Sequence, residues 1–196
     1  MKFILIGLHG SGKHEIAHQL QEMGVMYGKN FSNTPPNSTA YGEYEVYDNQ
    51  DITDIFENNA YIYMHEHCDE KIANSYKYFE GLSKYTYDNN NVFVMSPDQF
   101  MSISANNFPK DAIWVWLDNT KSNRQTRHKV EKRNYEFVNR EILEKNDIKE
   151  FVKTLYNEAN SNILYFTNEE PCRVATIIYT IIQHPELLSI YIKNFN

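Results

Sequence analysis

Arginine is absent from most of this chain. Among the 196 residues none occurs before Arg124, and four then fall between Arg124 and Arg140. An anion bound by the earlier part of the chain must therefore be held by lysine, by neutral donors or by the backbone. Acidic residues outnumber basic ones, 26 to 19, and the formal net charge of −7 opposes binding to nucleic acid or to an anionic membrane surface. Any anionic ligand needs a local positive site.

Cysteine and long apolar runs are scarce as well. Cys68 and Cys172 are far apart and neither belongs to a C-x-x-C pair, which argues against a disulfide framework and favours a reducing compartment. No apolar stretch approaches the roughly 18–20 residues that span a bilayer. The apolar start at Met1 to Ile6 is too short for a signal peptide, since glycines and charges follow at once. We expect a soluble, cytoplasmic protein with no nucleic-acid or membrane partner.

Short apolar runs predict the strands of a sheet. They lie at Lys2–Gly7, Val92–Met95, Ala112–Leu117 and Asn162–Thr167. Helical patterns follow them at Lys13–Met23, Pro97–Ala105, Lys121–Val130 and Glu169–Gln183, and further helices are predicted at Glu136–Ala159 and after Pro185. Strands that alternate with helices favour a parallel sheet covered by helices on both faces.

Residues 29–78 have a different character. Ten of the fifteen tyrosines lie between Tyr27 and Tyr87, and the segment is polar. We predict an inserted α+β subdomain here, with strands at Tyr41–Tyr47 and Ala60–His65. Between them we expect a short helix at Asp51–Asn59, capped by Asp51.

A glycine-rich loop joins the first predicted strand to the first predicted helix. Its core, Gly7-Leu8-His9-Gly10-Ser11-Gly12-Lys13, matches the P-loop pattern G-x-x-x-x-G-K. Glycines let the backbone curl so that successive N–H groups point at one anion, and the following helix adds its positive end. Lys13 supplies a point charge for the terminal phosphates. The predicted ATP-binding residues are Gly7, His9, Gly10, Ser11, Gly12, Lys13 and His14, with His9 either touching phosphate or only filling space.

His14 departs from the P-loop pattern. A serine or threonine at this place normally ligates Mg²⁺. Mg²⁺ prefers oxygen ligands to an imidazole nitrogen. We therefore expect any Mg²⁺ either to be held by water and another side chain or to bind more weakly than usual.

In the order and spacing of its motifs, the chain resembles the guanylate kinase family of nucleoside monophosphate kinases, as far as about Gln183. The loop has the family's Gly-x-x-Gly-x-Gly-Lys form. Segments similar to further family motifs follow in the family's order at Ser32 to Pro36, Tyr41 to Tyr47, Ile55 to Ile62, Trp114 to Leu117, Arg124 to Arg127, Val138 to Arg140 and Tyr165 to Asn168.

The resemblance implies a fold and a reaction. The implied fold is an α/β, P-loop NTPase-like parallel sheet of about five strands flanked by helices: a core at about 1–31 and 79–184, an acceptor-binding subdomain at 32–78, a lid at 124–145 and an extra helix at 185–196. The implied enzyme moves the γ-phosphoryl of ATP, with Mg²⁺, to GMP, dGMP or a related nucleoside monophosphate. Its catalytic residues would be Lys13, Arg127, Arg133 and Arg140. Its acceptor-binding residues would be Ser32, Thr34, Tyr44, Tyr76, Ser96 and Asp98, with Asp98 also the metal candidate.

Other functions stay open beside this one. The family holds its acceptor phosphate with two arginines in the inserted subdomain, where this chain has none. The chain could instead be a catalytically impaired guanylate-kinase-like module that takes a protein or peptide in the acceptor groove, or a P-loop kinase for another small compound. The segment His65-Glu66-His67-Cys68 is either a metal site or the partly exposed end of a strand.

Overall fold

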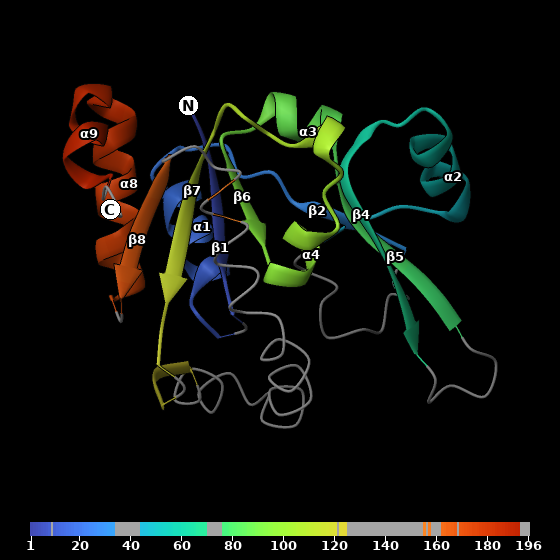
Figure 1. Ribbon diagram of the computed structural model, residues 1–196, viewed down its shortest axis with the longest axis horizontal. Helices are drawn as coiled ribbons and strands as arrows, with labels where there is room; N and C mark the ends of the chain where they lie inside the picture. The colour runs from blue at the N-terminus through green and yellow to red at the C-terminus, as the bar shows by residue number, and fades with distance from the viewer. Residues whose placement is uncertain are drawn as a thin grey trace. The chain divides into compact units, whose positions relative to one another are not determined.

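The computed structural model describes most of the chain as two compact units (Figure 1). The described residues are 1–8, 10–33, 44–69, 76–120, 122–124, 155, 157, 162–167 and 169–192. The first unit comprises residues 1–27, 91–98 and 110–196, and the second unit comprises residues 28–90 and 99–109.

A parallel four-stranded sheet forms the centre of the first unit. Its order is β6 (Val92–Met95), β1 (Lys2–Gly7), β7 (Ala112–Asp118) and β8 (Ile163–Thr167), and every neighbouring pair is parallel. Strand β6 is at one edge of this sheet. On its outer side, Tyr27 forms one isolated parallel bridge with Val92, at the position that a fifth strand of the sheet would take. The chain is an α/β protein with a parallel sheet flanked by helices, which confirms the predicted fold class.

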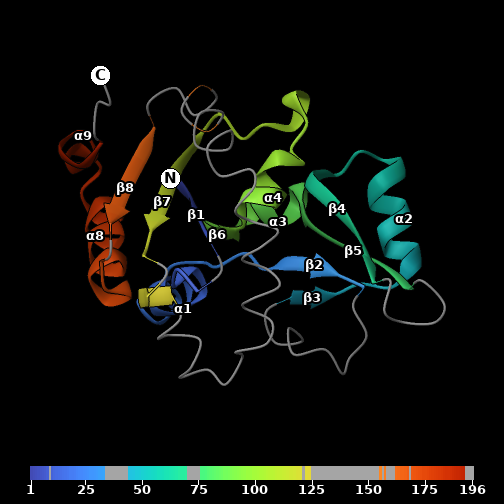
Figure 2. The same cartoon turned by 60° about the horizontal axis from the view of Figure 1, so that its bottom comes forward.

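Two helices cover one face of this sheet. Helix α1 (Lys13–Glu22) and helix α8 (Pro171–Gln183) pack against each other and against the strands (Figure 2). Their core residues share this face with alternate residues of the strands: Phe3, Leu5, Val94, Val115, Leu164, Ile16, Leu20, Ile178 and Ile181. Because successive strand residues point to opposite faces, Ile4 and Ile6 face the other side, and they are fully buried too. A strand buried on both faces explains why β1 is an unbroken apolar run.

The second unit is built on a mixed sheet. Its order is β3 (Tyr44–Val46), β2 (Asn30–Ser32), β5 (Tyr76–Ser83) and β4 (Tyr61–Asp69). Strands β2 and β3 are parallel, whereas β5 runs antiparallel to both β2 and β4. The sequence patterns had predicted β4 as a shorter strand and had not predicted β2 or β5.

Short helices complete the second unit and the chain. Helix α2 (Asn49–Glu57) begins after Asp48, whose side chain accepts from the amide of Asp51 in a capping box. The prediction that Asp51 caps this helix was therefore wrong, since Asp51 is its third residue. The remaining helical segments are α3 (Lys84–Asn89), α4 (Pro97–Met101), η1 (Ala105–Asn107), η2 (Pro185–Leu187) and α9 (Leu188–Tyr191).

Helix α4 is shorter than predicted and gives way to η1. The predicted helices at 121–130 and 136–159 lie mostly outside the described residues, although 122–124, 155 and 157 are helical. None of the helices within the described ranges combines the length and apolar composition needed to cross a bilayer.

Candidate functional site

The glycine-rich loop follows β1 directly and ends where α1 begins. Gly10 and Gly12 have φ angles of 77° and 93°, in the left-handed region that favours glycine. The amide of Ser11 donates to the carbonyl oxygen of Leu8 across 3.0 Å, which closes the turn. Gly12 is the N-cap of α1, and it provides no side-chain hydrogen bond to the first amides of the helix. The result is a tight curl of backbone at a helix N-terminus.

Gly7 allows the loop to approach strand β7 closely. A Cβ atom at this position would lie 2.8 Å from the carbonyl oxygen of Leu117 and 2.9 Å from Oγ of Ser11. No side chain fits there without movement of the backbone. Glycine at this place is therefore required by the close approach.

Lys13 folds back over the loop that precedes it. Its Nζ donates to the carbonyl oxygens of Gly7 at 2.6 Å and Leu8 at 3.0 Å, and lies 3.5 Å from Oγ of Ser11. The residue is only 7% exposed. One ammonium is thus held among the polar groups of the loop, where an anion gains most from a fixed charge.

Two residues after strand β7 contact the loop or support that contact. The Nδ2 of Asn119 donates to the carbonyl oxygen of Ser11 at 2.8 Å, and Nε of Arg124 donates to the carbonyl oxygen of Asn119 at 3.2 Å. Both side chains are buried, with Asn119 8% and Arg124 4% exposed. Sequence reasoning missed Asn119. Its position directly after β7 could have indicated a place near the loop, because the carboxyl ends of neighbouring parallel strands lie at the same edge of a sheet.

His14 is directed toward Tyr27 in this structure. Its Nδ1 lies 3.3 Å from the hydroxyl of Tyr27. The ring of Tyr27 also makes an edge-to-face contact with the ring of His18. This places one ring nitrogen of His14 in a contact within the first unit.

Ser96 and Asp98 place side-chain oxygen atoms just after strand β6. Met95, the last residue of β6, pairs with Ile6 of β1, so Ser96 emerges at the same sheet edge as the loop. The hydroxyl of Ser96 donates to Oδ1 of Asp98, whose side chain is exposed. Mg²⁺ is usually held in nucleotide sites by one or two carboxylates together with phosphates and water. The hydroxyl and carboxylate of this pair fit that ligand chemistry, whereas the imidazole of His14 does not.

No cluster of three or more histidine, cysteine or acidic residues within the described ranges has the geometry to hold a metal ion alone. The segment from His65 to Cys68 lies in strand β4, and the side chains of His67 and Cys68 are outside what the structure describes.

A hydrogen bond joins Tyr165, in the middle of β8, to Asp118, the last residue of β7. The hydroxyl of Tyr165 on β8 donates to Oδ2 of Asp118 on β7. Burial raises the pKa of Tyr165 above its ordinary value, and the hydrogen bond to Asp118 raises that pKa further. The pair lies at the carboxyl edge of the sheet, at the end where β1 leads into the loop.

Two of the residues predicted to bind the acceptor nucleotide, Ser32 and Tyr44, lie near the buried Glu80 of the second unit. Ser32 pairs with Glu80 across the sheet, and its hydroxyl donates to the carbonyl oxygen of Phe79 at 3.0 Å. The hydroxyl of Tyr44 donates to Oε2 of Glu80 at 3.1 Å, and Nε2 of Gln99 donates to Oε1 at 2.5 Å. Glu80 is 7% exposed. Sequence reasoning missed it because a lone glutamate in an unpredicted strand gives no signal.

Several predicted site residues cannot be placed. His9, Thr34, Arg127, Arg133 and Arg140 lie outside the described residues. Tyr76 begins strand β5, and its side chain is likewise outside what the structure describes. Of the predicted residues, the structure brings Gly7, Gly10, Ser11, Gly12 and Lys13 together in one loop.

A hollow of about 240 Å³ lies elsewhere in the first unit. Met1, Asn91, Tyr179 and Ile182 contribute to its lining. Met1 and Asn91 precede β1 and β6, so this hollow lies at the sheet edge opposite the loop. It does not belong to the candidate site.

Comparison with known proteins finds a similarity to solved structures in the path of the backbone. No protein-family model and no curated protein matches the sequence. One solved structure that resembles the chain is guanylate kinase from Anaplasma phagocytophilum, which is 11% identical, with 95% of this chain and 86% of that chain covered and a TM-score of 0.47. At this identity and TM-score the similarity identifies neither a family, nor a ligand, nor a reaction.

Proposed function

We propose that the loop from Gly7 to Lys13 binds the phosphates of ATP. The observation that carries this proposal is the position of Lys13, whose ammonium is held within 3.0 Å of two carbonyl oxygens of a curled, glycine-rich loop. Backbone amides of such a curl, the start of α1 and one fixed cation attract the same anion. The curled backbone and the buried ammonium together support polyphosphate binding by the first unit.

The proposed reaction is transfer of the γ-phosphoryl group of ATP to a nucleoside monophosphate, with GMP, dGMP or a related nucleotide as acceptor. Negative charge spreads over the oxygens of the transferred group, so catalysis depends on positioned cations more than on covalent chemistry. Lys13 is the proposed cation of the loop. Arg127, Arg133 and Arg140 are the proposed cations of a lid, since a guanidinium matches phosphate geometry and keeps its charge.

Asp98 and Ser96 are the residues proposed to hold Mg²⁺. Mg²⁺ bound there would neutralise part of the phosphate charge. The remaining contribution of this chain is orientation: the loop fixes the donor phosphates, while Ser32, Thr34, Tyr44 and Tyr76 of the second unit are proposed to contact the acceptor.

A second candidate function has its own supporting observation. The hydroxyl groups of Ser32 and Tyr44 both donate hydrogen bonds to protein oxygen atoms of the second unit. In addition, Glu80 places a carboxylate beside Tyr44. A phosphate dianion gains little from hydroxyls used in this way and is repelled by a nearby carboxylate. This arrangement favours a module that binds a nucleotide on the loop and a protein or peptide on the second unit, without turnover.

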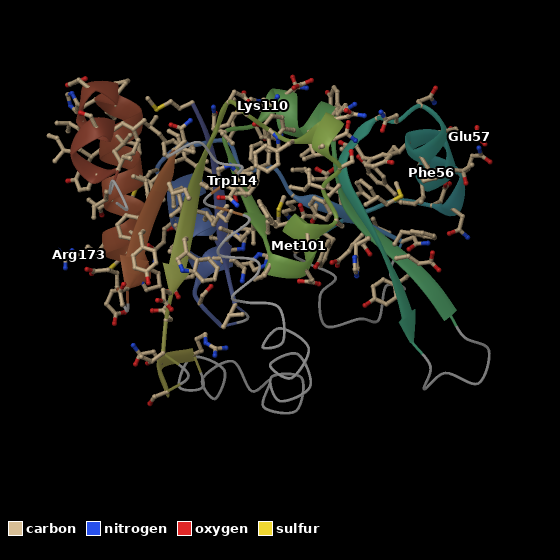
Figure 3. All side chains as sticks on the ribbon, viewed as in Figure 1. Phe56, Glu57, Met101, Lys110, Trp114 and Arg173 are labelled. Atoms are coloured by element: carbon tan, nitrogen blue, oxygen red, sulfur yellow. The ribbon has the colours of Figure 1, made fainter. Side chains whose placement is uncertain are left out.

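The deciding experiment is a turnover assay. The protein is incubated with ATP and Mg²⁺ against a panel of nucleoside monophosphates, and ADP is followed. Turnover with GMP that disappears in Lys13→Ala supports the kinase. The matched control is Lys110→Ala, because Lys110 is an exposed lysine of the first unit that precedes β7 (Figure 3). ATP binding without turnover on any acceptor favours the binding module, and absence of ATP binding contradicts both.

A further inference from the structure

We propose that Asn119 is a positioning residue for the bound nucleotide: by holding the carbonyl group of Ser11, it aims the N–H group of Gly12 at the phosphates. The inference rests on the proposed nucleotide binding. It concerns a residue 108 positions from the loop in the sequence, joined to it by a hydrogen bond of 2.8 Å.

The direction of this hydrogen bond is settled by chemistry. A backbone carbonyl only accepts, so the atom of Asn119 that faces Ser11 must be the amide nitrogen. The Oδ1 of Asn119 consequently points elsewhere. It is buried and has no hydrogen-bond partner among the described residues.

The geometry of the peptide bond links this contact to anion binding. The carbonyl of Ser11 and the N–H of Gly12 belong to one planar trans peptide, so they point in nearly opposite directions. Holding the carbonyl toward Asn119 therefore turns the N–H of Gly12 away from Asn119. It also keeps a carbonyl oxygen, which repels phosphate, out of the curl.

The loop cannot enforce this orientation by itself. Gly12 has a φ of 93°, and glycine adopts positive and negative φ with similar ease. The peptide between Ser11 and Gly12 could therefore rotate at small cost without an external contact. Asn119 supplies that contact from the end of strand β7, a rigid and buried element.

Arg124 fixes Asn119 from the other side. Its Nε donates to the carbonyl oxygen of Asn119, while its own backbone amide bonds to the carbonyl of Thr120 across 3.1 Å. Arg124 and Asn119 are thus joined to each other by a hydrogen bond, and Asn119 is joined to the loop. Arg124 acts through Asn119 in this proposal and needs no contact with the nucleotide.

The unpartnered Oδ1 argues against a purely structural role. A buried amide oxygen without a donor typically lowers stability by about 1–3 kcal/mol. Asparagine is therefore an inefficient choice if its purpose at this position were only to stabilise the fold. Its retained donor serves the carbonyl of Ser11.

The test compares Asn119→Leu with the matched variant Asn107→Leu. Asn107 is equally buried, lies in the second unit, and donates to Oδ1 of Asn59 at 3.2 Å. Binding of ATP and of inorganic tripolyphosphate is measured by calorimetry, well below the melting temperature of each variant. We expect Asn119→Leu to bind both ligands about tenfold more weakly than the unmodified protein, as expected for one misdirected donor to a charged group. Asn107→Leu should lower thermal stability and leave both affinities unchanged.

A second variant covers the case in which Asn119→Leu does not fold. Asn119→Asp keeps the shape but presents a carboxylate oxygen to the carbonyl of Ser11. At pH 8 its affinity should be low, and at pH 5.5 it should recover relative to the unmodified protein, because the protonated carboxyl can donate as Nδ2 did. The new carboxylate also repels the phosphates at pH 8, so this loss is compared with that in Thr120→Asp, which adds a carboxylate at the exposed neighbouring position; a positioning role requires the larger loss in Asn119→Asp.

The outcomes separate this inference from the proposed function. Equal affinities in Asn119→Leu and the unmodified protein, or an Asn119→Asp profile parallel to that of the unmodified protein, overturn the role of Asn119 alone. If the unmodified protein binds neither ATP nor tripolyphosphate, the proposed function fails, and the inference fails with it.

Discussion

Tyr44 donates its phenolic hydrogen to Oε2 of Glu80 across 3.1 Å, within the second unit. Gln99 binds the other oxygen of the same carboxylate at 2.5 Å. The segment from Gly28 to Asn90 contains four lysines, eleven acidic residues and no arginine. Because the acceptor of the proposed reaction carries a phosphate, the charge of Glu80 opposes its binding near Tyr44.

Replacement of Glu80 should therefore improve binding of an anionic acceptor. In Glu80→Gln the shape is kept and the negative charge is removed, so the Kd for GMP should fall several-fold at low salt. Calorimetry gives that Kd whether or not the protein turns over. The control is Glu57→Gln, which removes an exposed charge on α2 (Figure 3) and should change the Kd little. An unchanged Kd in Glu80→Gln would mean that the acceptor phosphate does not bind beside Tyr44.

Loss of the Lys13 ammonium should abolish stabilisation by nucleotide. A ligand that binds only the folded state stabilises it by about 2.7 kcal/mol at one hundred times its Kd. The melting temperature of the unmodified protein should rise with ATP, whereas that of Lys13→Met should not, because methionine keeps an apolar stem but no charge. Turnover, if present, should fall about 10²–10³-fold. Lys110→Met serves as the control, and an ATP-dependent shift in Lys13→Met equal to that of the unmodified protein would refute the role of Lys13.

Two glycine substitutions should separate binding from stability. The Cβ of Gly7→Ala would meet the carbonyl of Leu117 at 2.8 Å, and that of Gly81→Ala would meet the carbonyl of Tyr63 at 2.5 Å and the ring of Phe31. Each should lower the free energy of unfolding by about 1–3 kcal/mol, as overpacked sites do. Only Gly7→Ala should also weaken ATP binding, since only Gly7 belongs to the loop. Denaturant unfolding and calorimetry measure the two effects. Unchanged stability in Gly7→Ala would contradict the required close approach, and unchanged ATP affinity would contradict the role of this loop position in ATP binding.

Tyr165 should make stability fall at alkaline pH. Burial, and then the hydrogen bond to Asp118, raise its pKa above the ordinary value of about 10, so the folded state favours the protonated hydroxyl. That contribution is complete below pH 10 and is lost as pH rises through the raised pKa of the folded protein. Denaturant unfolding between pH 8 and pH 11 should therefore show a shallower loss of stability in Tyr165→Phe than in the unmodified protein.

A second tyrosine has to be taken into account in that measurement. Burial, followed by the charge of Glu45, also raises the pKa of Tyr47. Tyr47→Phe should thus remove a similar contribution from the second unit, and the double variant should be the least sensitive to pH. Identical slopes for Tyr165→Phe and the unmodified protein would show that neither burial nor the Asp118 contact raises the pKa of Tyr165 in solution.

The strands and helices of the first unit were largely predictable. Runs such as Phe3 to Ile6 and Val92 to Met95 are buried on both faces, and their composition alone marks them as strands. The observed bounds of α1 and α8 differ from the predicted ones by only one or two residues. Apolar periodicity and glycine punctuation are local signals, and they suffice where an element is defined by its own residues.

Strand β5 shows why the second unit was harder. Tyr76–Ser83 contains a glutamate and a glycine, which are both uncommon in strands, and it forms because β4 and β2 pair with it on either side. Gly81 is required there by the ring of Phe31, a contact that no local pattern reveals. Pairing with β4 and β2 therefore determines that this segment is a strand, which its intrinsic residue propensities do not predict.

The sequence by itself determined the composition and place of the loop: its glycines, its lysine and its position between a strand and a helix are contiguous, so their spacing alone predicts a phosphate-binding site. Only the tertiary structure decided that Asn119 holds Ser11 from 108 residues away and that Tyr44 faces Glu80 from 36 residues away. The physical reason is that such partners are chosen by strand order and register. Many pairings of strands satisfy the same apolar pattern, and only the packed chain selects one of them.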